Sequence, residues 1–215
     1  MEHAAIAAQR MLRALDWDVR DVRGGREFDV SSDPVERVHL VSWPSAKGLE
    51  PGDLDADLGP LLTYVHMLAR ALLAERVHPL FSTPAFSSDS EHRLVPGVLP
   101  VARASADWFA EHLVFAQLPG IKGEAVRTEM QMAASLAAAG VKGDNLRQAM
   151  VAAQAEGYLG MNPQGYRPEL ARVFLSVPPG SPSVFTLQAL GDLLASLTAG
   201  SRLRIEGETW RVSPP

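Results

Sequence analysis

The first half of the chain combines the two hydrophobic periodicities that distinguish helices from strands. Apolar residues recur every three or four positions in some segments, as on a helix face, and alternate in others, as in a half-buried strand. In order, the patterns predict a helix at 4–15, strands at 17–22, 26–30 and 36–43, a helix at 57–75, strands at 77–86 and 97–102, and a helix at 104–118. Gly24-Gly25 indicates a hairpin turn between the first two strands. We therefore expect a mixed α/β sheet covered on both faces.

The second half begins at the Pro/Gly-rich segment 119–123, and its pattern of apolar and polar residues differs from that of the first half. Its patterns predict helices at 128–140 and 145–157, a strand-turn-strand at 158–175, a linker at 178–183, a helix at 185–197 and a hairpin at 202–212. A winged helix-turn-helix has this order of elements: two helices joined by a turn, followed by a two-stranded wing. We expect three parts, namely an α/β domain over 1–118, a winged-helix α+β domain over 119–177, and a helix-plus-hairpin extension over 178–215.

Composition and charge narrow the classes of function. The 215 residues are 47% hydrophobic and 21% charged, which is typical of a globular chain. The chain has no cysteine, which excludes disulfides, thiolate metal sites and a cysteine nucleophile. The formal net charge is −5, and the acidic excess lies within residues 1–100, so nucleic-acid binding would need a local surface rather than a basic tail. The N-terminus lacks a signal-peptide pattern, and the apolar run 61–74 is too short to span a bilayer, so we expect a cytoplasmic protein without membrane contact.

The predicted helix at 145–156 carries the candidate DNA contacts. The face of this helix predicted to contact DNA consists of Asn145, Arg147, Gln148, Val151 and Gln154. Its Asn, Gln and Arg side chains can make paired hydrogen bonds to base edges in a major groove. The predicted wing at 162–167 adds Gln164 and Arg167, which suit phosphate or minor-groove contacts. The segment DNLRQAMVAAQAEGYLG resembles winged-helix transcription regulators, in which a recognition helix leads into the wing. The resemblance implies double-stranded DNA as the partner.

The first half resembles another family. AAIAAQRMLRALDWDVRDV is similar to the opening helix and strand of Mrr-type restriction endonucleases, which have the PD-(D/E)XK core. In REFDV, Asp29 stands where that family has its metal-binding aspartate, and VHPLFSTPAF resembles the family's later strand. Such nucleases also need a second carboxylate and a lysine on the third strand, but ERVHLVSW has neither at that spacing. The resemblance therefore implies a restriction-endonuclease-like domain that has lost its active site.

These observations lead to one expectation and two open alternatives. We expect a non-enzymatic DNA-binding or DNA-associated protein without a cofactor or a bound metal. Its apolar helix 185–197, with Leu187, Leu190, Leu194 and Leu197, is expected either to pack on the winged helix or to form a homodimer contact. The first alternative is an interaction or scaffold module that binds a protein partner and no nucleic acid. The second is a metal-dependent nuclease with an atypical site around Asp29.

Overall fold

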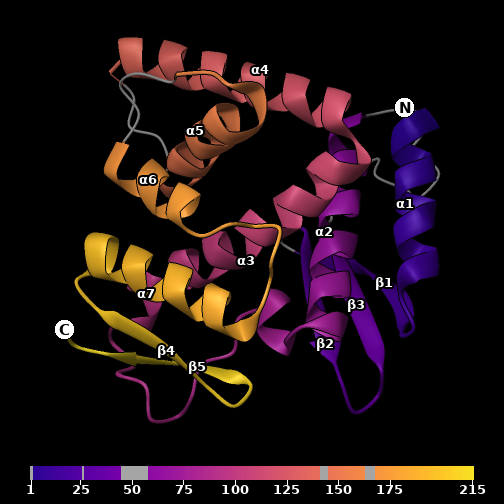
Figure 1. The fold of residues 1–215 in the computed structure, drawn as a ribbon. Coiled ribbons are helices and arrows are strands. Elements are labelled where there is room, and N and C mark those ends of the chain that lie inside the picture. Colours follow the sequence, from indigo (N-terminus) through magenta and orange to yellow (C-terminus); the bar gives the residue numbers. More distant parts are fainter. Residues whose placement is uncertain (1, 26, 45–57, 141–144, 163–167) are drawn as a thin grey trace.

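The computed structural model describes residues 2–25, 27–44, 58–140, 145–162 and 168–215, which form a mixed α/β structure (Figure 1). Its α-helices are α1 (Glu2–Ala14), α2 (Leu58–Arg76), α3 (Val95–Gln117), α4 (Pro119–Ala138), α5 (Asn145–Leu159), α6 (Pro168–Ser176) and α7 (Val184–Ala199). Its strands are β1 (Asp18–Gly25), β2 (Asp29–Asp33), β3 (Val38–Pro44), β4 (Arg202–Glu206) and β5 (Thr209–Ser213). Helices dominate, and the two sheets lie near the two ends of the chain.

The N-terminal sheet has the order β1-β3-β2, with β3 parallel to β1 and antiparallel to β2. The predicted hairpin between the first two strands is therefore wrong, because β3 lies between them. The three strands differ in polarity. β3 buries His39, Val41 and Trp43 on the side facing α2, whereas β1 is largely exposed. A central position suits the strand with the most side chains to bury, and an edge suits a polar strand.

Two segments predicted as strands in the first half are not strands. Within 77–86, Pro79–Phe81 forms a single 3-10 turn, and 97–102 lies inside α3. The start of α3 explains the second error, since a proline in the first turn is compatible with a helix. Val98, Val101 and Ala102 are buried at helical spacing and continue the face of the predicted helix at 104–118. A restriction-endonuclease-like core would need a further strand that the described part of this sheet does not contain.

The predicted strand-turn-strand at 158–175 is also wrong over its described part. Tyr158 and Leu159 complete α5, and residues 168–176 form α6. In α6, Leu170, Ala171 and Phe174 are buried at helical spacing, and Pro168 takes the first position, where its missing N–H costs nothing. The segment 163–167 lies outside the described residues. The strands expected for a wing directly after α5 are therefore replaced by a helix.

The C-terminal helix and hairpin are confirmed. Ser183 and Thr186 form a capping box at the start of α7, and Gly200 ends that helix in the left-handed conformation. β4 and β5 pair around a turn at Gly207, and Phe86 pairs with Trp210, which joins the hairpin to the first half of the chain. α7 packs against β4, α3 and α6 through the buried Leu187, Leu190 and Leu194. The predicted homodimer contact through this helix stays a prediction, and Leu197 is the predicted member that remains exposed.

One hydrophobic core runs from α1 to β5 and crosses the three parts expected from the sequence. α3 is its centre, because it packs against α2, α4, α5 and α7 (Figure 1). Trp108 on α3 packs against Phe174, and its indole N–H donates to the carbonyl of Val177 at 2.8 Å. α3 therefore joins the two halves of the chain. Among the described residues, no helix is both long and apolar enough to cross a membrane.

Candidate functional site

The predicted DNA-contact face of α5 is only partly accessible. Val151 is 3% exposed and Gln154 is fully buried, so neither can reach a base edge, and the expectation for these two residues is wrong. α5 packs against α3, α4 and α6, which cover it on more than one side. Asn145 is exposed and Gln148 is half-buried. Gln164 and Arg167 lie outside the described residues.

Arg147 on α5 points into an ionic cluster rather than away from the protein. Its Nε and Nη2 donate to the two carboxylate oxygens of Glu129 on α4, at 2.9 and 2.6 Å. Its Nη1 lies 3.4 Å from Glu111 on α3. A two-bond contact of this kind fixes a guanidinium in place. Arg147 is therefore held between three helices, and this cluster is the candidate functional site.

A cavity of about 330 Å³ lies beside this cluster. Four helices contribute to its wall, and each supplies at least one ionisable side chain. The lining residues are Gly59, Leu62, Thr63 and His66 from α2, Glu111 and Val114 from α3, Lys122, Ala125 and Glu129 from α4, and Arg147 from α5. Within α2, α3 and α4, each lining residue lies three or four positions from another, so each of these helices turns one face to the cavity.

Glu111 is the most deeply placed carboxylate of the cavity wall. Its side chain is 5% exposed, and Lys122 Nζ, with a side chain 8% exposed, lies 2.5 Å from its Oε2. Arg147 and His66 approach its other oxygen, Oε1, at 3.4 and 3.5 Å. Burial raises the pKa of Glu111, but Lys122, His66 and Arg147 outweigh this effect, so its pKa is lowered. Glu111 is therefore an ionised carboxylate surrounded by cationic groups.

His66 lies between two carboxylates one helical turn apart on α3. Its Nε2 is 3.0 Å from Asp107 Oδ1, and its Nδ1 is 3.5 Å from Glu111 Oε1. Among the described residues, His66 Nδ1 has no hydrogen-bond partner. Burial raises the pKa of Asp107, but Arg70 and His66 lower it more strongly, and it falls to about 2. The ionised Asp107 fixes the orientation of the imidazole at the cavity wall.

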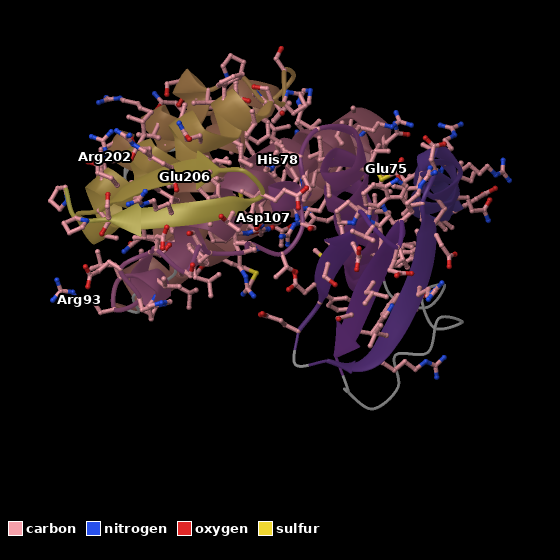
Figure 2. The ribbon with its side chains drawn as sticks, turned by 90° about the horizontal axis from the view of Figure 1, so that it is seen from below. Glu75, His78, Arg93, Asp107, Arg202 and Glu206 are labelled. Atoms are coloured by element: carbon pink, nitrogen blue, oxygen red, sulfur yellow. The ribbon has the colours of Figure 1, made fainter. Side chains whose placement is uncertain are left out.

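A second hollow of about 310 Å³ adjoins the first, and Arg147 lines both. The second hollow is bounded mainly by apolar side chains of α3 and α5, among them Leu99 and Met150, together with Arg103 and Asp107. Figure 2 places the labelled Asp107 near the middle of the molecule, between the hairpin β4–β5 and the N-terminal sheet.

Asp29, the candidate metal ligand of the nuclease alternative, is surrounded by cations and a hydroxyl. Its oxygens lie 3.5 Å from Arg70 Nη1 and 3.9 Å from Arg103 Nη2, and Thr83 Oγ1 donates to it at 3.0 Å. Within the described ranges, no group of three or more His, Cys, Asp or Glu side chains is placed to hold a metal ion. The geometry at Asp29 favours an ion pair over a magnesium site.

The sequence did not predict this cavity. Lys122 lies in a segment interpreted as a domain boundary, and no sequence motif links residues as far apart as Gly59 and Arg147. One signal was present, since Asp107 and Glu111 are four residues apart on a strongly apolar helix. Carboxylates on a face that is otherwise buried need partners, and they therefore point to a polar cluster. Comparisons with known protein families, with curated proteins and with solved structures found no match to this chain.

Proposed function

We propose that the protein binds a small zwitterionic molecule, of the size and charge of a free amino acid, in the cavity between α2, α3, α4 and α5. The observation that carries the proposal is the pairing of opposite charges on the wall of a concave site. A volume of about 330 Å³ falls at the lower end of the roughly 300–1,000 Å³ typical of small-molecule pockets. The site therefore suits a small ligand rather than a polymer.

The balance of charge favours a ligand that carries both signs. The accessible charged groups of the wall are Arg147 and Glu129, with side chains 40% and 34% exposed. Arg147 and Glu129 form an ion pair with each other, and the more deeply buried Lys122 and Glu111 form a second ion pair. A simple anion that binds Arg147 would compete with Glu129 and leave that carboxylate less well compensated, which is costly in a partly buried site. A zwitterion supplies one group to each partner and preserves neutrality.

The apolar part of the wall gives such a ligand a place for its carbon skeleton. Leu62, Val114 and Ala125 line the cavity, and the hydroxyl of Thr63 lies on the same wall. Burial of an apolar side chain stabilises a complex in proportion to the area removed from water, at about 25 cal/mol per Å². We therefore expect amino acids with medium-sized apolar side chains to bind more tightly than glycine.

A thermal-shift screen tests the proposal. The probes are free L-amino acids, the matching amines, and the matching N-acetyl amino acids, so that zwitterion, cation and anion are compared on one skeleton. A ligand present at a hundred times its Kd stabilises by about 2.7 kcal/mol, or roughly 5 to 10 °C for a chain of this size. We expect such a shift for zwitterions alone.

Variants identify the site of binding. Arg147→Met removes the accessible cation of the cavity. Arg202→Met is the matched control, because Arg202 makes the same two-bond contact with Asp192 on α7, far from the cavity along the chain. We expect Arg147→Met to abolish the ligand-induced shift and Arg202→Met to retain it. The proposal is wrong if no amino acid shifts the melting temperature, or if Arg147→Met responds like the parent protein.

Duplex DNA binding, the function expected from the sequence, is the competing proposal. Its remaining support is that Asn145 is exposed and Gln148 is half-buried at the start of α5. α6, α7 and the hairpin β4–β5 also have the order of a helix-turn-helix with a wing, although they lie downstream of the predicted position. However, the outward side of α7 carries the exposed Phe185 and Leu193, which cannot pair with phosphates.

Fluorescence anisotropy with labelled duplex DNA at two salt concentrations separates the two proposals. We expect no salt-sensitive binding at micromolar protein concentrations. Salt-sensitive binding that Gln148→Ala weakens would instead favour DNA contact through α5, and salt-sensitive binding that Arg202→Met weakens would favour DNA contact through the hairpin β4–β5. A ligand-induced thermal shift without DNA binding would favour the amino-acid site.

A further inference from the structure

Three polar side chains at the N-terminal sheet, those of Ser32, His39 and Glu75, are linked in series by hydrogen bonds and form a triad. Ser32 on β2 and His39 on β3 lie directly opposite each other in the antiparallel pair, and Ser32 Oγ is 2.8 Å from His39 Nδ1. His39 Nε2 is 3.2 Å from Oε2 of Glu75 near the end of α2. Figure 2 places the labelled Glu75 toward α1, away from Asp107, so this triad is separate from the cavity described above.

The hydrogen bonds of Glu75 determine which nitrogen of His39 carries the proton. Glu75 accepts hydrogen bonds from the backbone N–H groups of Asp16 and Trp17. Burial raises the pKa of Glu75, but these hydrogen bonds and His39 outweigh that effect and lower it, so the carboxylate is ionised. An ionised carboxylate can only accept, so Nε2 of His39 carries a hydrogen. In the neutral imidazole, Nδ1 is then the acceptor, and the Ser32 hydroxyl donates to it.

We propose that Ser32 is a nucleophile toward activated esters and fluorophosphonates, with His39 as its general base and Glu75 as the residue that positions His39. The three groups have the order and hydrogen-bond reach that a serine nucleophile needs. This proposal is independent of the ligand cavity. Its substrate class is a carboxylic ester with a good leaving group, and water is the second reactant.

The balanced reaction has two steps. In the first, Ser32 Oγ forms a bond to the acyl carbon, the proton of Oγ moves to His39 Nδ1, and the bond from the acyl carbon to the alcohol oxygen breaks. The departing alkoxide takes the proton from His39 and leaves as the alcohol. In the second step, the oxygen of water forms a bond to the acyl carbon and one of its protons moves to His39. The bond from the acyl carbon to Ser32 Oγ then breaks, the proton returns from His39 to Oγ, and the carboxylic acid departs.

Ser32 is more exposed than His39 and Glu75, as this chemistry requires. Ser32 is half-buried and lies on β2, which is an edge strand of the sheet formed by the described residues. The side chain of His39 is 0% exposed and that of Glu75 is 5% exposed. The ring of Trp17 stacks on His39 with the ring centres 5.0 Å apart. The nucleophile can therefore be reached from the sheet edge, whereas the base and the carboxylate are shielded from water.

The environment of His39 also keeps the base in the form that can accept a proton. Burial lowers the pKa of His39, and the hydrogen bond and the charge of Glu75 raise it again without reversing the effect. His39 is consequently neutral at pH 7. A neutral imidazole that already accepts a hydrogen bond from Ser32 is ready to take its proton.

Labelling with a fluorophosphonate tests the proposal on the full chain. The Oγ–P bond forms, the P–F bond breaks, fluoride leaves, and the proton is transferred to His39. We expect one adduct by intact mass, located on Ser32 by peptide mapping. Ser32→Ala should lose it, and Ser31→Ala should keep it, because Ser31 is exposed on the adjacent position but opposes Leu40 instead of a histidine.

Glu75→Gln tests the positioning role. We expect labelling to slow by about 10²-fold, within the range of general-base effects. In a plot of labelling rate against pH, the acidic limb should also move to lower pH in Glu75→Gln. Glu75 raises the pKa of His39, so removing its charge lowers that pKa. A purely structural Glu75 would not shift that limb. The proposal is overturned if the folded protein, verified by circular dichroism, gives no adduct, or if Ser32→Ala and Ser31→Ala label equally.

Discussion

Gln154 provides a test of the packing around α5. It is 0% exposed, and among the described residues neither its Oε1 nor its Nε2 has a hydrogen-bond partner. Nearly all buried polar groups in folded proteins are hydrogen-bonded, so an amide that loses its water without replacement is a local cost to stability. We predict that Gln154→Met stabilises the protein.

The magnitude follows from the burial of the amide. From measured protein variants, an amide buried without a partner costs about 1–3 kcal/mol. Methionine has nearly the same length as glutamine and adapts to irregular space, and the two have similar helix propensities, so little is lost elsewhere. We therefore expect the free energy of unfolding to increase by about 1–3 kcal/mol, with the melting temperature rising by roughly 2–4 °C for each kcal/mol.

Urea denaturation followed by circular dichroism at 25 °C measures this change. The control is Gln148→Met, the same substitution at a half-buried position on the same helix. There we expect a change within about 0.5 kcal/mol, as for most surface substitutions. The slope of the free energy against urea should be the same in all three proteins, which shows that the difference lies in stability.

A loss of stability in Gln154→Met would refute the reasoning. It would mean that the amide of Gln154 makes hydrogen bonds to water or to a bound molecule. Equal effects of Gln154→Met and Gln148→Met would show that the two positions are equally accessible, which contradicts the packing of α5. Reduced DNA affinity in Gln154→Met, without a change in stability, would restore the base-reading role that the sequence predicts.

Three further predictions concern the charged cluster and the hairpin. The folded-state pKa of Asp107 is about 2, below its ordinary value. The ionised carboxylate therefore stabilises the protein fully above about pH 4, and this stabilisation is lost as the pH falls toward 2. The urea midpoints of the parent and of Asp107→Asn should differ at pH 7 and converge between about pH 4 and pH 2. Lys122→Met should destabilise by roughly 3 kcal/mol in urea, because it leaves a buried carboxylate without its closest partner. Gly191→Ala should lower the melting temperature, since the new Cβ would lie 2.9 Å from Trp210, whereas Gly97→Ala, with its nearest neighbour at 3.9 Å, should not.

The elements predicted correctly are those with a long, continuous pattern of their own. The helices at 4–15, 57–75 and 145–157, the strand at 36–43 and the hairpin at 202–212 all appear with small shifts at their ends. A helix of several turns repeats its apolar spacing often enough to be distinguished from a strand. The apolar runs at 77–86 and 97–102 are too short to show which spacing they follow, and packing against neighbouring elements decided their conformation.

The sequence by itself determined the mixed helix and strand composition and the turn of the C-terminal hairpin, because these depend on residues close together along the chain. Only the tertiary structure decided that β3 lies between β1 and β2 and that Val151 and Gln154 face inward. α5 is rich in alanine, so its polar face is only weakly distinguished from the rest of the helix, and packing against α3, α4 and α6 decided which side is covered. The same applies to His66, Glu111, Lys122 and Arg147, whose common cavity exists only because four helices pack around it.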